Sequence, residues 1–386
     1  MSDSPRRICY LASAANIHTR KWALHFAGRG YDVHVASLHA QREDMTGVSV
    51  HYLEGERRAR PVVPRWRYLL AVNQARALLR RLRPQILHTH YAGGYGLLGS
   101  LTGFHPYVVS VWGSEVLQFP HSSPLHRALV KFNIARADYV CSTSRYMARL
   151  TQEYTAHDVL LTPFGVDCAQ FTSDGGEAHH DDGAVTIGTV KALDPGYGIE
   201  HLIQAFAALR RRKLPHDLRL LIVGEGPERQ RLERMARALA VNDVTEFTGW
   251  VPHTQVPEYL RRLSVYVAPS VQEESFGVAV LEASACGVPV VVSRVGGFPE
   301  VVQDRVTGFL VPPRDTVALA DVLERLVMSR ELRDTMGAAG REFVLEHYAW
   351  DATARIVEDL YDRILRARPT TRAGVHVGGC RHSAPG

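Results

Sequence analysis

The sequence lacks several features that secreted and zinc-binding proteins share. Its five cysteines are scattered and form no Cys-x-x-Cys pair, which argues against a zinc site and favours a reducing compartment. No apolar signal segment follows the opening MSDSPRR. Residues 91–114 contain no Lys, Arg, Asp or Glu, but their glycines and Pro106 favour a helix and a strand over a membrane span. We therefore expect a cytoplasmic protein.

The length and the charge distribution both indicate two unlike domains. At 386 residues the chain is longer than one ordinary hydrophobic core requires. The net charge of +5 comes from residues 1–170, because the remainder has a slight excess of acidic residues. Nine arginines and no acid lie between Arg57 and Arg83, beside apolar residues such as Trp66 and Leu69. This basic segment, 57–83, could lie on an anionic membrane surface or be a solvated helix. No aromatic-basic motif accompanies it, so nucleic acid is not an expected partner.

Strands and helices are predicted in alternation along most of the chain, which is typical of parallel sheets. The first half has predicted strands at Arg7–Ala12, Tyr31–Ser37, Gln85–His90, Tyr107–Trp112, Ala137–Thr143 and Asp158–Thr162, and a helix from about Arg20 to Gly30. The second half has predicted strands at Val185–Val190, Leu218–Val223, Thr245–Thr248, Tyr266–Ala268 and Val290–Val292. Between the halves, residues 171–184 are polar and rich in Gly and Asp, which predicts a linker.

One stretch, residues 265–297, combines a strand, an acidic loop and a helix from about Gly277 to Cys286. The N-terminus of such a helix has unpaired N–H groups and a partial positive charge, so it can hold a phosphate or pyrophosphate. Glu274 precedes the helix and Glu282 lies within it. Carboxylates repel phosphate, but they accept hydrogen bonds from sugar hydroxyls. We therefore expect a nucleotide diphosphate ligand, with one glutamate on a donor sugar and the other on a ribose.

This stretch resembles the signature of the family 4 glycosyltransferases, retaining enzymes of the GT-B fold. A pair of glutamates eight positions apart is by itself also typical of a solvated helix, but here the flanking residues match as well. The matching residues are Glu274-Ser275-Phe276-Gly277, Glu282-Ala283, Ala285-Cys286-Gly287-Val288-Pro289-Val290-Val291, Gly296-Gly297, Pro299-Glu300-Val301 and Thr307-Gly308.

The resemblance covers about residues 6–366 and implies an α/β fold of two Rossmann-like domains that face a cleft. We expect an acceptor-side domain at residues 1–170, the linker at 171–184 and a nucleotide-sugar-binding domain at 185–350. A helix at 351–366 would cross back to the first domain, and residues 367–386 would be a disordered tail.

The resemblance also implies roles for single residues. Three residues would be catalytic: Glu274 would position the donor sugar, Lys191 would bind the phosphates, and His90 would lie near the acceptor. The remaining donor-binding residues would be Glu282, at the ribose, with Ser275, Phe276, Gly277, Val278, Gly224 and Val251. The acceptor-side candidates are Asn16, His18, Trp112 and Glu115.

The sequence departs from the family pattern in several places, among them the loop Ser13–Thr19, which lacks the family's glycines, and Trp112, where many relatives carry a histidine. Relatives usually carry an Arg and a Lys at the positions of Ala192 and Tyr197, where both cations bind the leaving pyrophosphate. Phe164 replaces an Asn of the family's hinge motif. His90 has a second interpretation as a histidine with satisfied hydrogen bonds at a strand end, and with His88 it lacks a third ligand for a metal.

We expect a retaining glycosyltransferase that moves a hexosyl group from a nucleotide diphosphate sugar to a glycan, lipid-linked or small-molecule acceptor. The chain has no Asp-x-Asp pair, so no metal and no other cofactor is expected. The leaving group would instead interact with the helix dipole and Lys191. The alternatives are a non-catalytic nucleotide-sugar-binding subunit and a GT-B epimerase or hydrolase. A peripheral position on the inner face of the membrane stays open.

Overall fold

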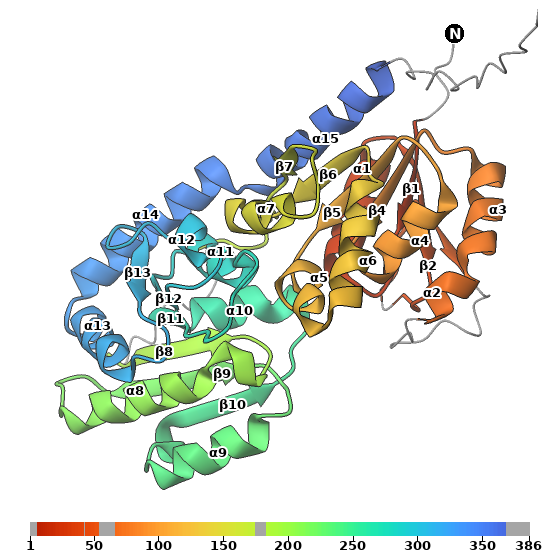
Figure 1. Cartoon of the computed structure of the whole chain (residues 1–386). Coiled ribbons are helices and arrows are strands. Elements are labelled where there is room, and N and C mark those ends of the chain that lie inside the picture. The colour runs from red at the N-terminus through yellow and green to blue at the C-terminus, as the bar shows by residue number, and fades with distance from the viewer. Residues whose placement is uncertain (1–5, 42, 54–65, 174–182, 368–386) are drawn as a thin grey trace, which may run out of the picture.

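The computed structural model describes residues 6–41, 43–53, 66–173 and 183–367, and its two β-sheets lie in separate halves of the molecule (Figure 1). The first sheet has the strand order β3-β2-β1-β4-β5-β6-β7, and the second has the order β10-β9-β8-β11-β12-β13. Every pair of neighbouring strands is parallel. In both sheets the strand order reverses beside the first strand, as in Rossmann-like folds. The predicted fold of two Rossmann-like domains is confirmed.

The strands of the first sheet are short and mostly buried, because helices cover the faces of a parallel sheet. They are β1 (Arg7–Leu11), β2 (Asp32–Ser37), β3 (Val48–Tyr52), β4 (Ile86–His90), β5 (Tyr107–Val111), β6 (Tyr139–Ser142) and β7 (Val159–Leu161). The sequence does not predict β3. This strand lies at the edge of the sheet and is only partly buried, so it mixes polar and apolar residues.

The helices of the first domain begin with α1, which starts three residues before the predicted Arg20. The Oδ1 atom of Asn16 accepts hydrogen bonds from the backbone N–H groups of His18 (2.8 Å) and Thr19 (3.2 Å), which is the geometry of an N-cap. The helices are α1 (Ile17–Gly28), α2 (Trp66–Leu70), α3 (Val72–Leu82), α4 (Gly94–Thr102), α5 (Ser114–Leu117), the 3₁₀ helix η2 (Phe119–Ser122), α6 (Pro124–Ala135) and α7 (Arg145–Gln152).

The second domain has six strands, of which the short edge strand β13 is not predicted by the sequence. They are β8 (Val185–Val190), β9 (Leu218–Val223), β10 (Thr245–Gly249), β11 (Val265–Ala268), β12 (Val290–Ser293) and β13 (Gly308–Val311). The helices are η3 (Pro195–Tyr197), α8 (Ile199–Arg211), α9 (Arg229–Ala238), η4 (Asn242–Val244), η5 (His253–Gln255), α10 (Val256–Arg261), α11 (Val278–Ala285), α12 (Phe298–Val301), α13 (Thr316–Met328) and α14 (Arg330–His347).

The last helix, α15 (Trp350–Arg366), leaves the second domain and packs along the first, as predicted (Figure 1). Its Glu358 accepts a hydrogen bond of 2.7 Å from Nε2 of His25 on α1. Its Tyr361 is fully buried and contacts Nδ1 of His88 (2.5 Å) and the hydroxyl of Tyr10 (3.1 Å) through its own hydroxyl. These contacts therefore fix α15, which follows α14 of the second domain, to the first domain.

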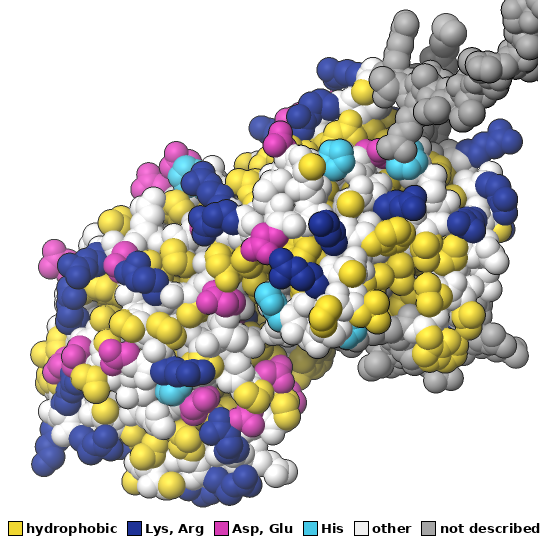
Figure 2. All heavy atoms as spheres, viewed as in Figure 1, with side chains coloured by type: hydrophobic (Ala, Val, Ile, Leu, Met, Phe, Trp, Pro, Cys, Tyr) yellow, Lys and Arg dark blue, Asp and Glu magenta, His cyan; other side chains and the backbone are white. Residues whose placement is uncertain are grey.

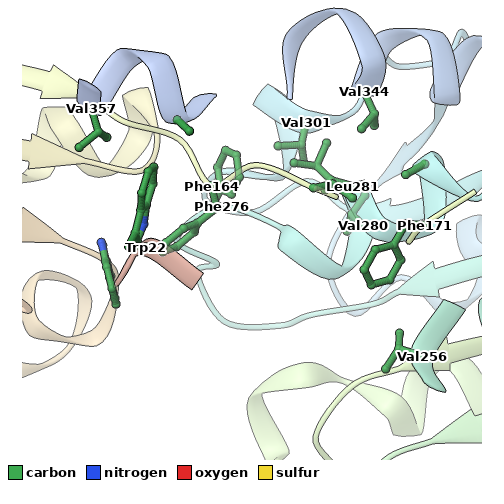
Figure 3. Packing of buried hydrophobic residues seen from close by; sticks show 14 of the residues in the cluster. Trp22, Phe164, Phe171, Val256, Phe276, Val280, Leu281, Val301, Val344 and Val357 are labelled. Atoms are coloured by element: carbon green, nitrogen blue, oxygen red, sulfur yellow. The ribbon is translucent and has the colours of Figure 1, made fainter. Parts of the chain in front are cut away.

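The two domains share one hydrophobic cluster, which continues across the segment that joins them. Figure 3 shows Trp22 of the first domain, Phe164 of the connecting segment and Phe276 of the second domain lying close together. The Phe164 and Phe276 ring centroids are 6.2 Å apart. The segment is also held by backbone hydrogen bonds of 2.8 Å from Val166 N to Tyr348 O and from Trp350 N to Val166 O. The joint between the domains is therefore packed.

Three predicted features lie wholly or partly outside the described residues. These are residues 57–65 of the basic segment, 174–182 of the linker and 368–386 of the tail. Where the basic segment is described it consists of two helices, α2 and α3, and not one. Among the residues the structure describes, no helix combines the length and the apolar character that crossing a membrane demands.

Candidate functional site

The centre of the site is the loop that leads from β11 into α11. Gly277 precedes α11 with a φ of +131°, and a Cβ atom there would lie 2.9 Å from Cγ2 of Val301. Only glycine suits this combination of backbone angle and close packing. Phe276, just before it, is buried against Tyr348, with ring centroids 5.6 Å apart. Val278 begins the helix, so the backbone N–H groups of its first turn are directed toward the space before it.

Glu274 and Lys191, two of the three predicted catalytic residues, lie in direct contact. The Nζ atom of Lys191 is 3.1 Å from Oε1 and 3.3 Å from Oε2 of Glu274. Ser270 donates a second hydrogen bond of 2.7 Å to Oε1. The Glu274 side chain is 11% exposed, so the pair is shielded but can still be reached by a ligand.

Tyr197, which stands where relatives usually have a lysine, supports Lys191. The Nζ atom of Lys191 lies 4.1 Å from the centroid of the Tyr197 ring, within the range of a cation–π interaction. The substitution therefore removes one cation but holds the other in place. Ala192, the second departure from the family pattern, is exposed.

Two glycines bring the backbones of this site close together. A Cβ at Gly224 (φ +142°) would lie 1.9 Å from the carbonyl oxygen of Lys191. A Cβ at Gly296 (φ +51°) would lie 2.1 Å from the carbonyl oxygen of Glu274. The positions of Lys191 and Glu274 thus depend on glycines from two other loops.

Glu282, on α11, is buried and contacts His253, which the sequence reasoning missed. Its Oε1 atom is 2.8 Å from Nε2 of His253. His253 begins η5, two residues after the predicted donor-binding residue Val251. Val251 is partly buried, whereas its neighbour Trp250 is 73% exposed. In the sequence, His253 is indicated by its place two residues after Val251. Its pairing with Glu282 is not indicated, because the two residues lie far apart in the chain.

His90 ends β4, and Trp112 directly follows the neighbouring strand β5. The two side chains lie together and are both buried. Nδ1 of His90 is 3.0 Å from Oγ1 of Thr19, and the His90 and Trp112 ring centroids are 4.2 Å apart. Burial lowers the pKa of His90 well below its usual value, so the ring is neutral at pH 7. Trp112 is only 5% exposed, so little of its ring is open to a sugar. His88, the other histidine of this strand, has both ring nitrogens hydrogen-bonded, one to Tyr361 and one to Ser110.

The acceptor-side candidates on α1 contact other protein groups. Asn16 caps α1, as described above, and its Nδ2 atom lies 3.4 Å from the Tyr91 hydroxyl. The His18 ring stacks on Phe164 with centroids 4.0 Å apart and an interplanar angle of 18°. Burial, together with the charges of Lys21 and His253, lowers the pKa of His18 to about 3. Phe164, which replaces the family's asparagine, thus gives His18 an apolar partner.

Glu115 is a buried acidic residue of the short helix α5, directly after the Gly113 loop that faces the second domain. It accepts hydrogen bonds from the backbone N–H groups of Trp112 (2.5 Å) and Gly113 (2.9 Å). Burial raises its pKa to about 7 against the opposing effect of these hydrogen bonds. A Cβ at Gly113 would lie 3.5 Å from Oγ of Ser275. The Gly113 loop, which leads into the helix of Glu115, therefore meets the Glu274 loop across the domain interface.

The Glu274 loop makes a second contact across the interface, through Ser275. Ser144 Oγ donates a hydrogen bond of 2.6 Å to the carbonyl oxygen of Ser275. Glu300 accepts hydrogen bonds from the backbone N–H groups of Arg145 (2.7 Å) and Tyr146 (2.6 Å) at the start of α7. Within the described ranges, no group of three or more His, Cys, Asp or Glu side chains is placed to hold a metal ion.

Comparisons with known proteins agree in both halves of the chain. The family described as "Glycosyl transferases group 1" matches residues 174–343, and "Glycosyl transferase 4-like" matches residues 7–144. The chain is similar to a GDP-mannose-dependent alpha-(1-6)-phosphatidylinositol monomannoside mannosyltransferase of Mycolicibacterium smegmatis, with 33% identity over 290 residues, or 70% of this chain and 75% of that protein. It is also similar to an N-acetyl-alpha-D-glucosaminyl L-malate synthase of Bacillus anthracis, with 29% identity over 73% of this chain and 75% of that protein.

Solved structures show the same fold. A sucrose-phosphate synthase from Thermosynechococcus elongatus matches with a TM-score of 0.79 and 24% identity, over 93% of this chain and 99% of that one. The Anabaena protein HepE, in complex with UDP and glucose, matches with a TM-score of 0.76 and 16% identity, over 93% of this chain and 100% of that one.

Proposed function

This chain belongs to the family 4 glycosyltransferases, and we propose that Glu274, Lys191 and the start of α11 form the centre at which it breaks the bond between a donor sugar and its nucleotide diphosphate. It is an enzyme that transfers a glycosyl group from a nucleotide sugar to an acceptor. The observation that carries the proposal is the shielded Glu274–Lys191 pair, 3.1 Å apart, beside the N-terminus of α11.

Each group in this centre has a distinct part in the proposed reaction. The acceptor hydroxyl attacks the anomeric carbon on the face from which the phosphate leaves, so the configuration of the sugar is retained. The first-turn N–H groups of α11 and the ammonium of Lys191 stabilise the negative charge that develops on the leaving phosphate. Glu274 accepts hydrogen bonds from sugar hydroxyls, and Glu282 accepts them from the ribose. The leaving phosphate takes the acceptor's proton.

The two alternative functions are not favoured. A non-catalytic subunit is disfavoured because the relatives described above are named as enzymes and because both glutamates of the motif are present and shielded here. An epimerase or hydrolase acts without an acceptor, whereas the relatives described above are named as enzymes that join two molecules. Transfer to an acceptor therefore stays the proposed reaction.

The proposed reaction is independent of divalent metal, and this is testable by ligand binding. We expect one nucleotide among UDP, GDP and ADP, alone or with its sugar, to raise the midpoint of thermal unfolding, with EDTA present as well as absent. Each ~1 kcal/mol of binding free energy raises the midpoint of a domain of this size by about 2–4 °C. The matching nucleoside is the control, because it lacks the phosphates. Loss of the shift in EDTA would refute metal independence, and no shift at millimolar nucleotide would refute the donor site.

We also propose that α2 and α3 bind an anionic membrane surface. Trp66, Leu69 and Leu70 on α2 are 60%, 54% and 63% exposed, and the neighbouring α3 carries exposed arginines such as Arg76 and Arg80. Fully burying an exposed leucine is favourable by about 1.5–3 kcal/mol, so inserting the half-exposed Leu69 and Leu70 gains part of this each, and basic residues add to it.

This membrane proposal predicts a position-specific effect of one charge. Leu69→Asp should weaken binding to vesicles that contain phosphatidylserine by about tenfold or more, measured by co-sedimentation. Leu345→Asp is the matched control, because Leu345 is 45% exposed on α14 in the second domain. Equal binding of the two variants, or no binding of the unchanged protein, would contradict the proposal.

A further inference from the structure

The first domain contains a cavity of about 520 Å³ that the donor site does not use. Helices α2, α4, α5 and α6 and the 3₁₀ helix η2 contribute its walls. Its lining includes polar residues such as Ser13, Tyr91 and Glu115 and apolar residues such as Leu97, Phe119 and Leu129. The cavity can therefore accommodate a molecule that has both polar and apolar groups.

The charge of the cavity excludes anionic ligands. None of the described residues that line it is Lys or Arg. Its acidic group is the carboxyl of Glu115, which is 5% exposed. His39 also lines the cavity, and burial lowers its pKa from the usual value, so it supplies no positive charge at pH 7. A phosphate or carboxylate placed here would lack a partner and would lie near a carboxyl group.

The part of the cavity at Glu115 adjoins the donor site. Glu115 lies in α5, two residues after Gly113, where a Cβ would lie 3.5 Å from Ser275 Oγ, next to Glu274. A hydroxyl held at the Glu115 end is thus directed toward the loop that carries Glu274. No other described element lies between Gly113 and Ser275 at this contact.

The outside of the cavity is apolar. Figure 2 shows a broad group of hydrophobic side chains over α2, α4 and α6. Exposed apolar residues on these helices include Trp66 and Leu70 on α2 and Leu125 on α6, which is 76% exposed. Tyr68, on the same helix as Trp66, lines the cavity itself. Helix α2 thus contributes Tyr68 to the cavity wall and exposed apolar side chains to the outer surface.

We propose that this cavity binds the acceptor and selects an uncharged amphiphile, with a hydroxylated head toward Glu115 and an apolar portion against Leu97, Phe119 and Leu129. This inference rests on the proposed function and adds the chemical class of the acceptor. In the reaction, the acceptor's hydroxyl oxygen forms a bond to the anomeric carbon while the bond from that carbon to the phosphate oxygen breaks. The hydroxyl proton passes to the leaving nucleoside diphosphate, and no other reactant is consumed.

The test measures sugar transfer from the donor identified by thermal shift to several acceptors, each at the same concentration. The probes are octyl β-D-glucoside below its micelle-forming concentration, 4-nitrophenyl β-D-glucoside, glucose and L-malate. We expect both amphiphilic glucosides to accept sugar with a kcat/KM at least tenfold above that of glucose, and no product from malate. The ratio of the kcat/KM values of the two glucosides shows whether the site prefers an aliphatic or an aromatic apolar portion. Glucose as good as the glucosides, or preferred transfer to malate, would overturn the inference.

Two variants on one helix locate the selection in the cavity. Leu129→Asp places a charge in the cavity wall and should lower kcat/KM for the better glucoside by tenfold or more. Leu125→Asp makes the same change on the exposed part of α6 and should alter it less than twofold. Phe119→Ala, expected to cost at least fivefold, replaces Leu129→Asp if that variant does not fold. Equal effects at 125 and 129 would move the site to the outer surface and overturn the inference.

The thermal shift distinguishes a failure of the acceptor inference from a failure of the proposed donor site. The thermal shift caused by the donor nucleotide should be unchanged in all three variants, because none of these residues lies in the donor site. A normal shift without transfer to either glucoside would overturn the acceptor inference alone. No shift in the unchanged protein would remove the donor site and the inference with it.

Discussion

Replacing Glu274 with Gln should lower the rate of sugar transfer by about 10²–10³-fold and leave the affinity for the free nucleotide almost unchanged. This is the size of effect seen when one preorganised electrostatic contact to a transition state is lost. Gln keeps the shape of Glu274 and can still accept the hydrogen bond from Ser270, which is 2.7 Å long. It loses the negative charge that faces Lys191 and the stronger acceptor for the sugar hydroxyls.

The reason for expecting a split between transfer and binding lies in the position of Lys191. Without the charge at 274, its ammonium has no anionic partner from that side chain and is fully available to the diphosphate. Nucleotide affinity should therefore stay within about threefold of the unchanged protein or increase slightly. Transfer is measured as release of nucleoside diphosphate in the presence of acceptor, and affinity by calorimetry with the nucleotide alone.

Glu273 provides the matched control for this prediction. It is the neighbouring residue, it is exposed, and Glu273→Gln makes the identical chemical change. We expect Glu273→Gln to change neither quantity by more than about twofold. Equal losses of transfer and nucleotide affinity in Glu274→Gln would mean that Glu274 acts on the nucleotide or on folding rather than on the sugar.

The sequence predicts the parts of this molecule that depend on local pattern. Buried strands such as β12 have continuous apolar runs, and the motif around Glu274 and Glu282 lies in a short stretch of chain. The edge strand β3 escapes prediction because it is only partly buried and so mixes polar and apolar residues, and no local pattern sets apart the four residues of β13. Their strand conformation is set by the neighbouring strands that they pair with.

The contacts that shape the candidate site depend on residues far apart in sequence. Nothing local indicates that Tyr197 supports Lys191 or that His253 contacts Glu282, because each pair meets only when loops from different strands converge. The burial of Trp112 has the same origin. Its ring packs beside His18 and Phe164, and Phe164 comes from the connection between the domains.

The glycines of the site allow close contacts between backbone segments, and a Cβ at Gly224 would make one of the shortest contacts. Gly224→Ala should destabilise the protein by about 3 kcal/mol and weaken nucleotide binding by at least tenfold. A φ of +142° is unfavourable for alanine, and the added Cβ would lie 1.9 Å from the Lys191 carbonyl oxygen and 2.9 Å from its carbon. Backbone atoms cannot move aside as a flexible side chain can, so the Lys191 segment must shift.

Gly28→Ala is the control that separates this clash from the general effect of the added methyl group. Gly28 ends α1, and a Cβ there meets nothing within 4 Å. Alanine favours helix over glycine by up to about 1 kcal/mol, so this variant should be as stable as the unchanged protein or more so. The midpoint of thermal unfolding and the nucleotide dissociation constant are measured for both variants. If Gly224→Ala behaves as Gly28→Ala does, the close approach at Gly224 does not position Lys191. If its stability falls while nucleotide affinity holds, Lys191 is not a phosphate ligand, because its displacement would then have no effect on binding.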